Sequence, residues 1–141
     1  ELSRVSVSHF IDTFEQMGLI VKAKPISTNE RESISKATKI YFTDLGVRNA
    51  LIDNFSDWNN RQDTGPLLEN AVFVGVKRQL DYAESSYQLG FFRSPYGAEI
   101  DIVKKVKDAT ELFEVKVSKS SRKLPPNITV VTMSTAQKYL Y

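Results

Sequence analysis

One helical pattern followed by three short strand patterns, between Gly65 and Val117, most constrains what this chain can fold into. From Gly65 to about Leu80 the apolar residues recur at intervals of three and four, which predicts an amphipathic helix. Pro66 stands at its start, where a missing backbone N–H costs no hydrogen bond. Strands are predicted at about residues 87–93, 98–103 and 111–117, and a last one near 128–133. We therefore expect an α/β domain in which helices flank a mixed, partly antiparallel sheet.

Charged residues occupy alternate positions in two of these strands. Side chains alternate between the two faces of a strand, so residues two apart share a face. Glu99 and Asp101 alternate with isoleucines, and Glu114 and Lys116 flank a valine. Neighbouring strands should therefore bring carboxylates and a lysine together on the face opposite their apolar residues.

Glu69 lies on the apolar stripe of the preceding helix, where a hydrophobic residue is expected. A buried carboxylate without a partner is costly, so this position favours a residue with a partner in the fold. The alternative is an exposed acid near the helix N-terminus, where the helix dipole stabilises negative charge. Glu114-Val115-Lys116 taken alone also fits an exposed strand face with cross-strand charge pairs. The occurrence of Glu69, Asp101, Glu114 and Lys116 in this order favours a functional site over isolated surface charges.

The order of these residues resembles the PD-(D/E)XK nuclease-like superfamily: helical Glu69, then Glu99-Ile100-Asp101, then Glu114-Val115-Lys116. Nearly the whole chain, with Lys39-Ile40-Tyr41-Phe42-Thr43-Asp44, resembles the domain of unknown function that follows the ATPase core in bacterial and archaeal AAA-type ATPases. The resemblance implies a restriction-endonuclease-like fold. It also implies that Asp101 and Glu114 hold one or two divalent metals, that Glu69 completes the shell, and that Lys116 orients the attacking water. The catalytic residues would then be Asp101, Glu114 and Lys116.

The amino-acid types available limit the metal. The chain has no cysteine and a single histidine, His9, so oxygen ligands must hold any bound ion. Oxygen ligands suit hard cations, and we expect Mg²⁺ or Mn²⁺. Such cations and a lysine stabilise the negative charge that develops during phosphodiester hydrolysis.

The segment after the Glu114-Val115-Lys116 strand departs from the superfamily, whose members usually place a helix there. Residues 118–126 are short, polar and end in two prolines, so a full helix is not expected. Three basic residues of this segment are candidates for weak phosphate contacts: Lys119, Arg122 and Lys123. Basic residues exceed acidic ones by only 11 to 8 over residues 65–141, which is a weak footprint for nucleic acid.

Residues 1–64 are predicted to form the tail of a winged helix and a connector, with the nuclease-like domain spanning residues 65–141. An amphipathic helix should start after Ser6 as its N-cap and end at Gly18. Two strands, near 19–21 and 38–42, and a short helix near 47–52 should follow. The apolar stripe of the first helix should pack against these strands and the short helix: Val7, Phe10, Ile11, Phe14 and Met17.

Two acids, Asp12 and Glu15, lie among the outward positions of the first helix, without a basic residue. They would repel phosphate, which favours a structural or protein-interaction role over DNA reading and leaves both open. Three functions thus stay open: a metal-dependent nuclease, a catalytically inactive nuclease-like module that binds or regulates an ATPase, and a winged-helix DNA-binding module.

The partners follow from the resemblance and from what the sequence lacks. No G-x-x-x-x-G-K-[S/T] motif occurs, so an ATPase core would lie upstream in the same polypeptide. The chain starts at Glu1 without an initiating methionine and is expected to be part of something longer. No apolar run approaches the about 20 residues that span a bilayer, so we expect a soluble, cytoplasmic protein without a membrane partner. The sequence leaves open whether the protein forms oligomers.

Overall fold

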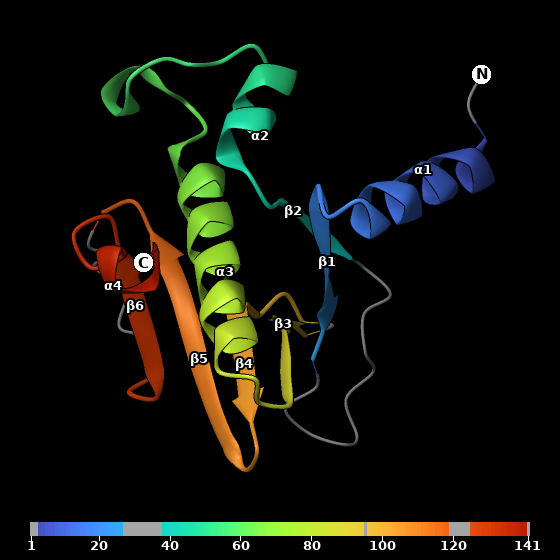
Figure 1. Cartoon of the computed structure of the whole chain (residues 1–141). Coiled ribbons are helices and arrows are strands. Elements are labelled where there is room, and N and C mark those ends of the chain that lie inside the picture. The colour runs from blue at the N-terminus through green and yellow to red at the C-terminus, as the bar shows by residue number, and fades with distance from the viewer. Residues whose placement is uncertain (1–2, 27–37, 95, 119–124, 141) are drawn as a thin grey trace.

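A six-stranded mixed sheet organises the chain, in a computed structural model that describes residues 3–26, 38–94, 96–118 and 125–140 (Figure 1). The strand order is β2-β1-β3-β4-β5-β6. The pairs β1/β2, β3/β4 and β4/β5 are antiparallel, while β1/β3 and β5/β6 are parallel. The strands are β1 (Ile20–Pro25), β2 (Lys39–Phe42), β3 (Tyr87–Arg93), β4 (Glu99–Val106), β5 (Ala109–Lys116) and β6 (Ile128–Thr132).

Helices flank this sheet, which confirms the predicted α/β class. The helical elements are α1 (Arg4–Gln16), α2 (Leu45–Leu51), the 3₁₀ turn η1 (Trp58–Asn60), α3 (Thr64–Tyr82) and α4 (Gln137–Leu140). The long helix α3 lies across the face of β4 and β5, with α4 beside it (Figure 1). No helix in the described ranges is long and apolar enough to span a membrane.

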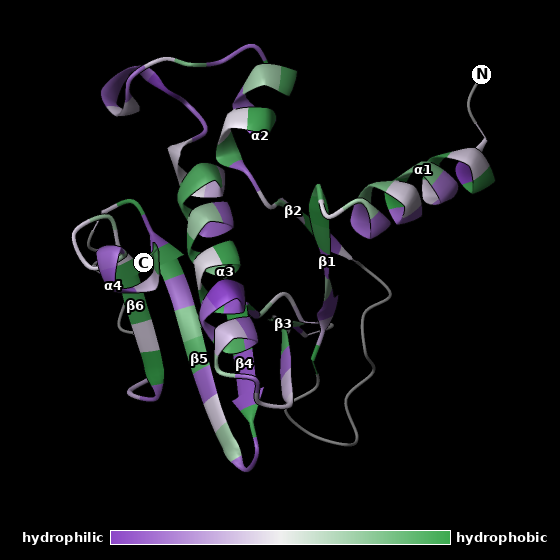
Figure 2. Cartoon of the chain, in the orientation of Figure 1, coloured by the Kyte–Doolittle hydropathy of each residue, from purple (hydrophilic) through white to green (hydrophobic). Residues whose placement is uncertain are grey.

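The core lies between α3 and the sheet. Phe73 of α3, Phe91 of β3 and Phe113 of β5 are almost fully buried there. Each such side chain contributes about 1.5–3 kcal/mol through apolar burial. The helical pattern predicted from Gly65 is confirmed, and the helix begins one residue earlier and continues to Tyr82. In Figure 2 the apolar positions of β5 alternate with polar ones, as its half-buried pattern requires.

Strands from both sides of the predicted boundary near residue 64 belong to this one sheet. Lys24 of β1 pairs with Gly90 of β3, and the N–H of Ile26 donates to the carbonyl of Phe91 at 2.7 Å. A Cβ at Gly90 would lie 2.1 Å from the Lys24 carbonyl oxygen, so glycine permits this close approach. The division into two domains stays a prediction.

The end of α1 confirms the role predicted for Gly18. Gly18 adopts φ +73°, its N–H bonds the Glu15 carbonyl, and the Leu19 N–H reaches back to the Phe14 carbonyl. These two bonds form a Schellman motif. The predicted N-cap was wrong: Ser3 caps α1 by accepting from the Ser6 N–H at 3.1 Å.

The predicted packing of the α1 stripe is also wrong in this chain. Helix α1 projects away from the sheet (Figure 1) and has no buried residue. Phe10 and Phe14 are 49% and 43% exposed. Polar contacts hold the helix instead, because Lys22 of β1 lies 2.6 Å from Asp12 and 2.8 Å from Glu15. The two acids predicted to face solvent are thus partners of β1.

Two details of β4 differ from the expected regular strand. Its link to β5 is a two-residue turn, with Lys107 at φ +53°, where a longer charged connection was expected. The pairing with β3 runs Gly90 to Val103 and Phe92 to Ile100, so two β4 residues oppose one residue of β3. Such a bulge interrupts strict alternation and re-aims side chains.

Candidate functional site

A lysine that sequence reasoning did not assign to the site, Lys39, gathers the carboxylates. Its Nζ lies 2.9 Å from Glu69 Oε1, 3.0 Å from Glu99 Oε1 and 3.9 Å from Asp101 Oδ1. Lys39 belongs to β2 and its partners to α3 and β4, so the cluster joins the predicted N-terminal segment to the predicted nuclease-like part. Burial opposes the charge of Lys39, yet hydrogen bonds with Glu69 and Glu99 keep its pKa above the ordinary value.

Tyr41, two residues along β2, completes the contacts of Glu69. Its hydroxyl donates to Glu69 Oε1 at 2.6 Å, and its ring stacks on Phe73 with centroids 4.0 Å apart. Burial and the neighbouring Glu69 carboxylate raise the pKa of Tyr41 far above its usual range. Glu69 is therefore a partly buried acid with two donors, and the alternative of an exposed first-turn acid is wrong.

Asp101 sits against the strand that carries Glu114 and Lys116. Its Oδ2 accepts the Val115 N–H at 2.8 Å, between these two residues in the chain. The carboxylate is only 16% exposed. Burial raises the pKa of Asp101 to about 6; the Val115 hydrogen bond opposes this rise, and the charges of Glu69 and Glu114 add to it. Two other carboxylates thus lie close enough to repel Asp101.

Glu114 and Lys116 form a pair of their own on β5, with Nζ 2.6 Å from Oε1. Glu114 is largely buried, while Lys116 is 40% exposed. The structure thus brings Glu69 and Asp101 together around Lys39 and places the Glu114–Lys116 pair beside Asp101. The alternative of an exposed face with cross-strand pairs does not describe Glu114, which is 13% exposed and pairs with Lys116 of its own strand. A cross-strand pair lies further along the hairpin, where Lys104 of β4 is 2.6 Å from Glu111 of β5.

Glu99 and Asp101 of β4 reach the same lysine, as their spacing of two residues allows. Glu99 and Asp101 flank Ile100, and the bulge lies just after it, at residues 101 and 102. Ile102 joins the core under α3, while its neighbour Asp101 still reaches toward Lys39 of β2. Glu99 is held from a second side by Arg93 of β3, at 2.9 Å. Although burial alone would raise it, hydrogen bonds from Lys39 and Arg93 lower the pKa of Glu99.

The charges around the site leave Asp101 least compensated. Lys39 contacts Glu69 and Glu99 within 3.0 Å, Arg93 also contacts Glu99, and Lys116 contacts Glu114. Asp101 has one backbone N–H and Lys39 at the longer distance of 3.9 Å. In the part of the chain that the structure describes, four carboxylates thus share three cationic side chains, which favours a further positive charge next to Asp101.

The donor set suits a hard cation, with one restriction. Within the described residues, no three Asp, Glu, His or Cys side chains are arranged as a ready-made ligand set. Mg²⁺ usually binds through one or two carboxylates plus waters and substrate phosphates. Asp101 and Glu114 are the two carboxylates that suit such a site, although Glu114 also contacts Lys116, while Glu69 is engaged by both Lys39 and Tyr41.

Sequence reasoning missed Lys39 and Tyr41 and gave Glu99 no role in the site. The available signal was their spacing: Lys39 and Tyr41 are two apart on a predicted strand, so they share a face. What was missing was the position of β2 next to α3, which no periodicity encodes. The three basic candidates for phosphate contact, Lys119, Arg122 and Lys123, lie outside the described residues.

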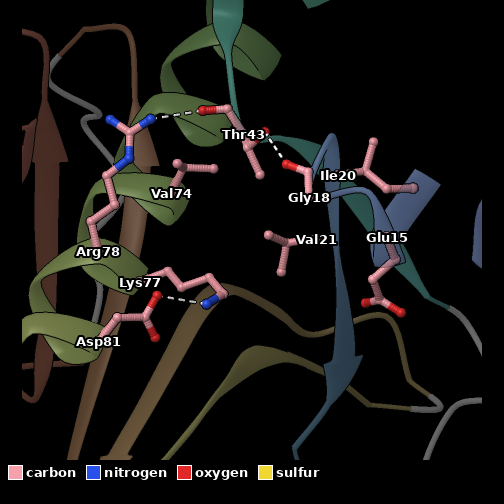
Figure 3. A pocket seen from close by; sticks show the side chains of 9 residues that line it. All are labelled: Glu15, Gly18, Ile20, Val21, Thr43, Val74, Lys77, Arg78 and Asp81. Atoms are coloured by element: carbon pink, nitrogen blue, oxygen red, sulfur yellow. Dashed lines mark hydrogen bonds and ion pairs between the residues drawn. The ribbon is translucent and has the colours of Figure 1, made fainter. Parts of the chain in front are cut away.

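A separate hollow of about 270 Å³ lies between the end of α1, β1 and α3 (Figure 3). Its charged groups already have partners: Lys77 pairs with Asp81 at 2.7 Å, and Arg78 donates to the Thr43 carbonyl at 2.8 Å. None of Glu69, Asp101, Glu114 and Lys116 lines it. The charged groups of this hollow are paired with one another or with the backbone, so we do not consider it a candidate catalytic site.

Comparisons with known proteins give two matches. Residues 1–58 match the family described as domain of unknown function DUF8612. Neither the curated proteins nor the solved structures contain a significant match. Residues 64–129, which include Glu69, Asp101, Glu114 and Lys116, match the family described as domain of unknown function DUF4143.

Proposed function

We propose that this chain carries a metal-dependent phosphodiesterase site of the PD-(D/E)XK nuclease type, with nucleic acid as substrate. One observation carries the proposal: Asp101 contacts the backbone between Glu114 and Lys116, and its one cationic neighbour among the described residues is Lys39 at 3.9 Å. The helical Glu69 nearby adds to the support, because its charge raises the pKa of Asp101. Such a site is suited to Mg²⁺ or Mn²⁺.

Each residue has a definite role in this proposal. Asp101 and Glu114 bind the ion. Glu69 holds Lys39 in place, and its negative charge acts on Asp101. The bound ion supplies Lewis-acid stabilisation of the phosphate charge. Lys116 is 40% exposed beside Glu114, and its ammonium holds a water or phosphate oxygen at the solvent side. The upstream ATPase core is proposed as the partner that controls access to the site.

A second candidate function is a nuclease-like module without catalysis, which binds or regulates that ATPase. It is favoured by Lys39, whose ammonium already neutralises Glu69 and Glu99. A winged-helix DNA-binding module is the remaining alternative. It requires salt-sensitive binding without metal.

The test combines metal binding with cleavage. Binding of Mn²⁺ and Mg²⁺ is measured by calorimetry for wild type, Asp101→Asn and Glu114→Gln, and cleavage of single- and double-stranded DNA and RNA is followed with wild type and Lys116→Ala. Asp81→Asn is the matched control, because Asp81 is also a lysine-paired acid but lies outside the site. We expect Asp101→Asn to abolish binding, Lys116→Ala to abolish cleavage but keep binding, and the control to keep both.

The outcomes separate the candidates. Metal binding without cleavage of any substrate, including in the presence of the ATPase core, favours the non-catalytic module. Equal metal binding by wild type and Asp101→Asn contradicts the proposed site.

A further inference from the structure

We infer that Lys39 is a built-in cation that fills the position of a second divalent ion, so that the site binds one ion rather than two. This inference rests on the proposed function, because it concerns how many ions the same carboxylates accept. It adds a residue that lies outside the part of the chain matched to DUF4143, residues 64–129.

The surroundings of the Lys39 ammonium are those of a bound cation. Three carboxylate oxygens surround Nζ at 2.9, 3.0 and 3.9 Å, from Glu69, Glu99 and Asp101. The lysine side chain is 21% exposed, and its Nζ lies 5.3 Å from the centre of the Phe91 ring. A partly buried ammonium is stabilised in its charged form by these carboxylates, and the carboxylates are stabilised by the ammonium.

Asp101 links this position to the proposed metal position. Its Oδ1 points toward Lys39, while its Oδ2 contacts the β5 backbone between Glu114 and Lys116. Two-metal sites hold their ions about 3.5–4 Å apart. Asp101 therefore lies between the Lys39 ammonium and the β5 backbone next to Glu114.

Charge also favours one ion. Among the described residues, Lys39, Arg93 and Lys116 face the four acids Glu69, Glu99, Asp101 and Glu114, which leaves one negative charge uncompensated, at Asp101. Removal of the Lys39 charge frees Glu69 and Glu99, whose remaining contacts are Tyr41 and Arg93. The side chains left behind form a second acidic position that shares Asp101 with the first.

The experiment counts bound Mn²⁺ per chain by electron paramagnetic resonance and by calorimetry. We expect one ion in wild type, two in Lys39→Gln and one again in Lys39→Gln/Glu99→Gln. Lys39→Arg keeps the positive charge and should stay at one ion. Lys77→Gln is the matched control, since Lys77 pairs with Asp81 away from the site, and should also stay at one.

Failure of this inference and failure of the proposed function give different results. One ion in both wild type and Lys39→Gln overturns the role of Lys39. If wild type binds no ion, the proposed metal site is contradicted. If Lys39→Gln then binds one ion more than wild type, the role of Lys39 is still supported.

A measurement on the unmodified chain avoids variants that fail to fold. In wild type with ¹⁵N-labelled lysine, the Lys39 ammonium should keep its nuclear magnetic resonance signal when Mg²⁺ saturates the first position. Release of that ammonium to the chemical shift of solvent-exposed lysines would mean that the ion takes its place, which overturns the inference.

Discussion

The side-chain amide of Asn70 pairs with both backbone groups of Phe42. Its Oδ1 accepts the Phe42 N–H at 2.9 Å, and its Nδ2 donates to the Phe42 carbonyl at 2.8 Å. Since β2 is an edge strand, the amide takes the place of a neighbouring strand at this residue. The contact anchors the strand of Lys39 and Tyr41 to the helix of Glu69.

Replacement of Asn70 by aspartate should therefore destabilise the fold. The carboxylate still accepts from the Phe42 N–H but faces the Phe42 carbonyl without a proton to donate, and Asn70 is almost fully buried. A buried polar group left unsatisfied costs about 1–3 kcal/mol. Denaturant unfolding of Asn70→Asp measures this loss in the free energy of unfolding. Asn59→Asp on the exposed 3₁₀ turn should change it by only about 0.5 kcal/mol or less; equal losses in both variants would show that the amide pair is not the cause.

The fold was predictable where local pattern and packing agree. The strand predicted at about residues 87–93 is β3, because apolar residues there face one core in a period of two. The packing of α1 was not predictable, because its apolar stripe gives a helix in any context while the partner of that stripe is a tertiary fact. Here Lys22 holds the helix through Asp12 and Glu15, while no residue of α1 is buried within the described part of the chain.

The site was predictable only in part, for a related reason. Glu69, Asp101 and Glu114 stand out because acids interrupt apolar patterns or alternate with them. Lys39 gave no such signal, since an isolated lysine on a short strand is ordinary. Its role depends on β2 lying beside α3, which arises from contacts between segments distant in the sequence.

Tyr41→Phe tests the second donor to Glu69. The ring keeps its stack on Phe73, but the hydroxyl that donates to Glu69 at 2.6 Å is lost. Hydrogen bonds to charged groups are worth about 1.5–3 kcal/mol, so the free energy of unfolding should fall by about that much at neutral pH. Chemical denaturation measures it. Tyr82→Phe, at a strongly exposed position, is the control and should leave stability unchanged within error; a loss as large as that of Tyr41→Phe would rule out the Glu69 contact as its source.

Gly75→Ala tests the close approach of α3 and α4. A Cβ at Gly75 would lie 1.8 Å from the Tyr139 carbonyl oxygen, so α4 must move or detach. Such overpacking typically costs about 1–3 kcal/mol, and we expect a loss of at least this size in thermal unfolding. Gly65→Ala in the first turn of the same helix is the matched control.

At Gly65 the nearest atom to an added Cβ is Val117 Cγ2 at 3.9 Å, which is ordinary contact. Alanine should therefore leave stability unchanged or raise it by about 1 kcal/mol through its higher helix propensity. If both alanine variants stabilised the chain, α4 would not be packed on α3 as described.

The last prediction concerns the pH dependence of stability that Asp101 imposes. Because burial first, and then the charges of Glu69 and Glu114, raise its pKa from 3.8 to about 6, the native chain binds more protons than the unfolded chain between these values. The contribution of Asp101 to the free energy of unfolding must then fall as pH rises through this window. At about 1.4 kcal/mol per pKa unit, the loss above pH 6 reaches about 3 kcal/mol.

Asp101→Asn should therefore stabilise the metal-free chain at pH 7 and leave it no more stable near pH 4, since the amide oxygen still accepts the Val115 N–H. Urea unfolding from pH 4 to 7.5 with a chelator present measures the difference between wild type and variant. Asp81→Asn should act with the opposite sign. Burial alone would raise the pKa of Asp81, but hydrogen bonds from Lys77 and Tyr87 lower it, so its charge stabilises the native chain above its unfolded pKa. This variant should lose stability at pH 7 and approach wild type as pH falls.

A variant Asp101→Asn that is less stable than wild type at pH 7 would contradict the prediction. It would mean that the attraction of Asp101 to Lys39, at 3.9 Å, outweighs the cost of burial and the repulsion from Glu69 and Glu114.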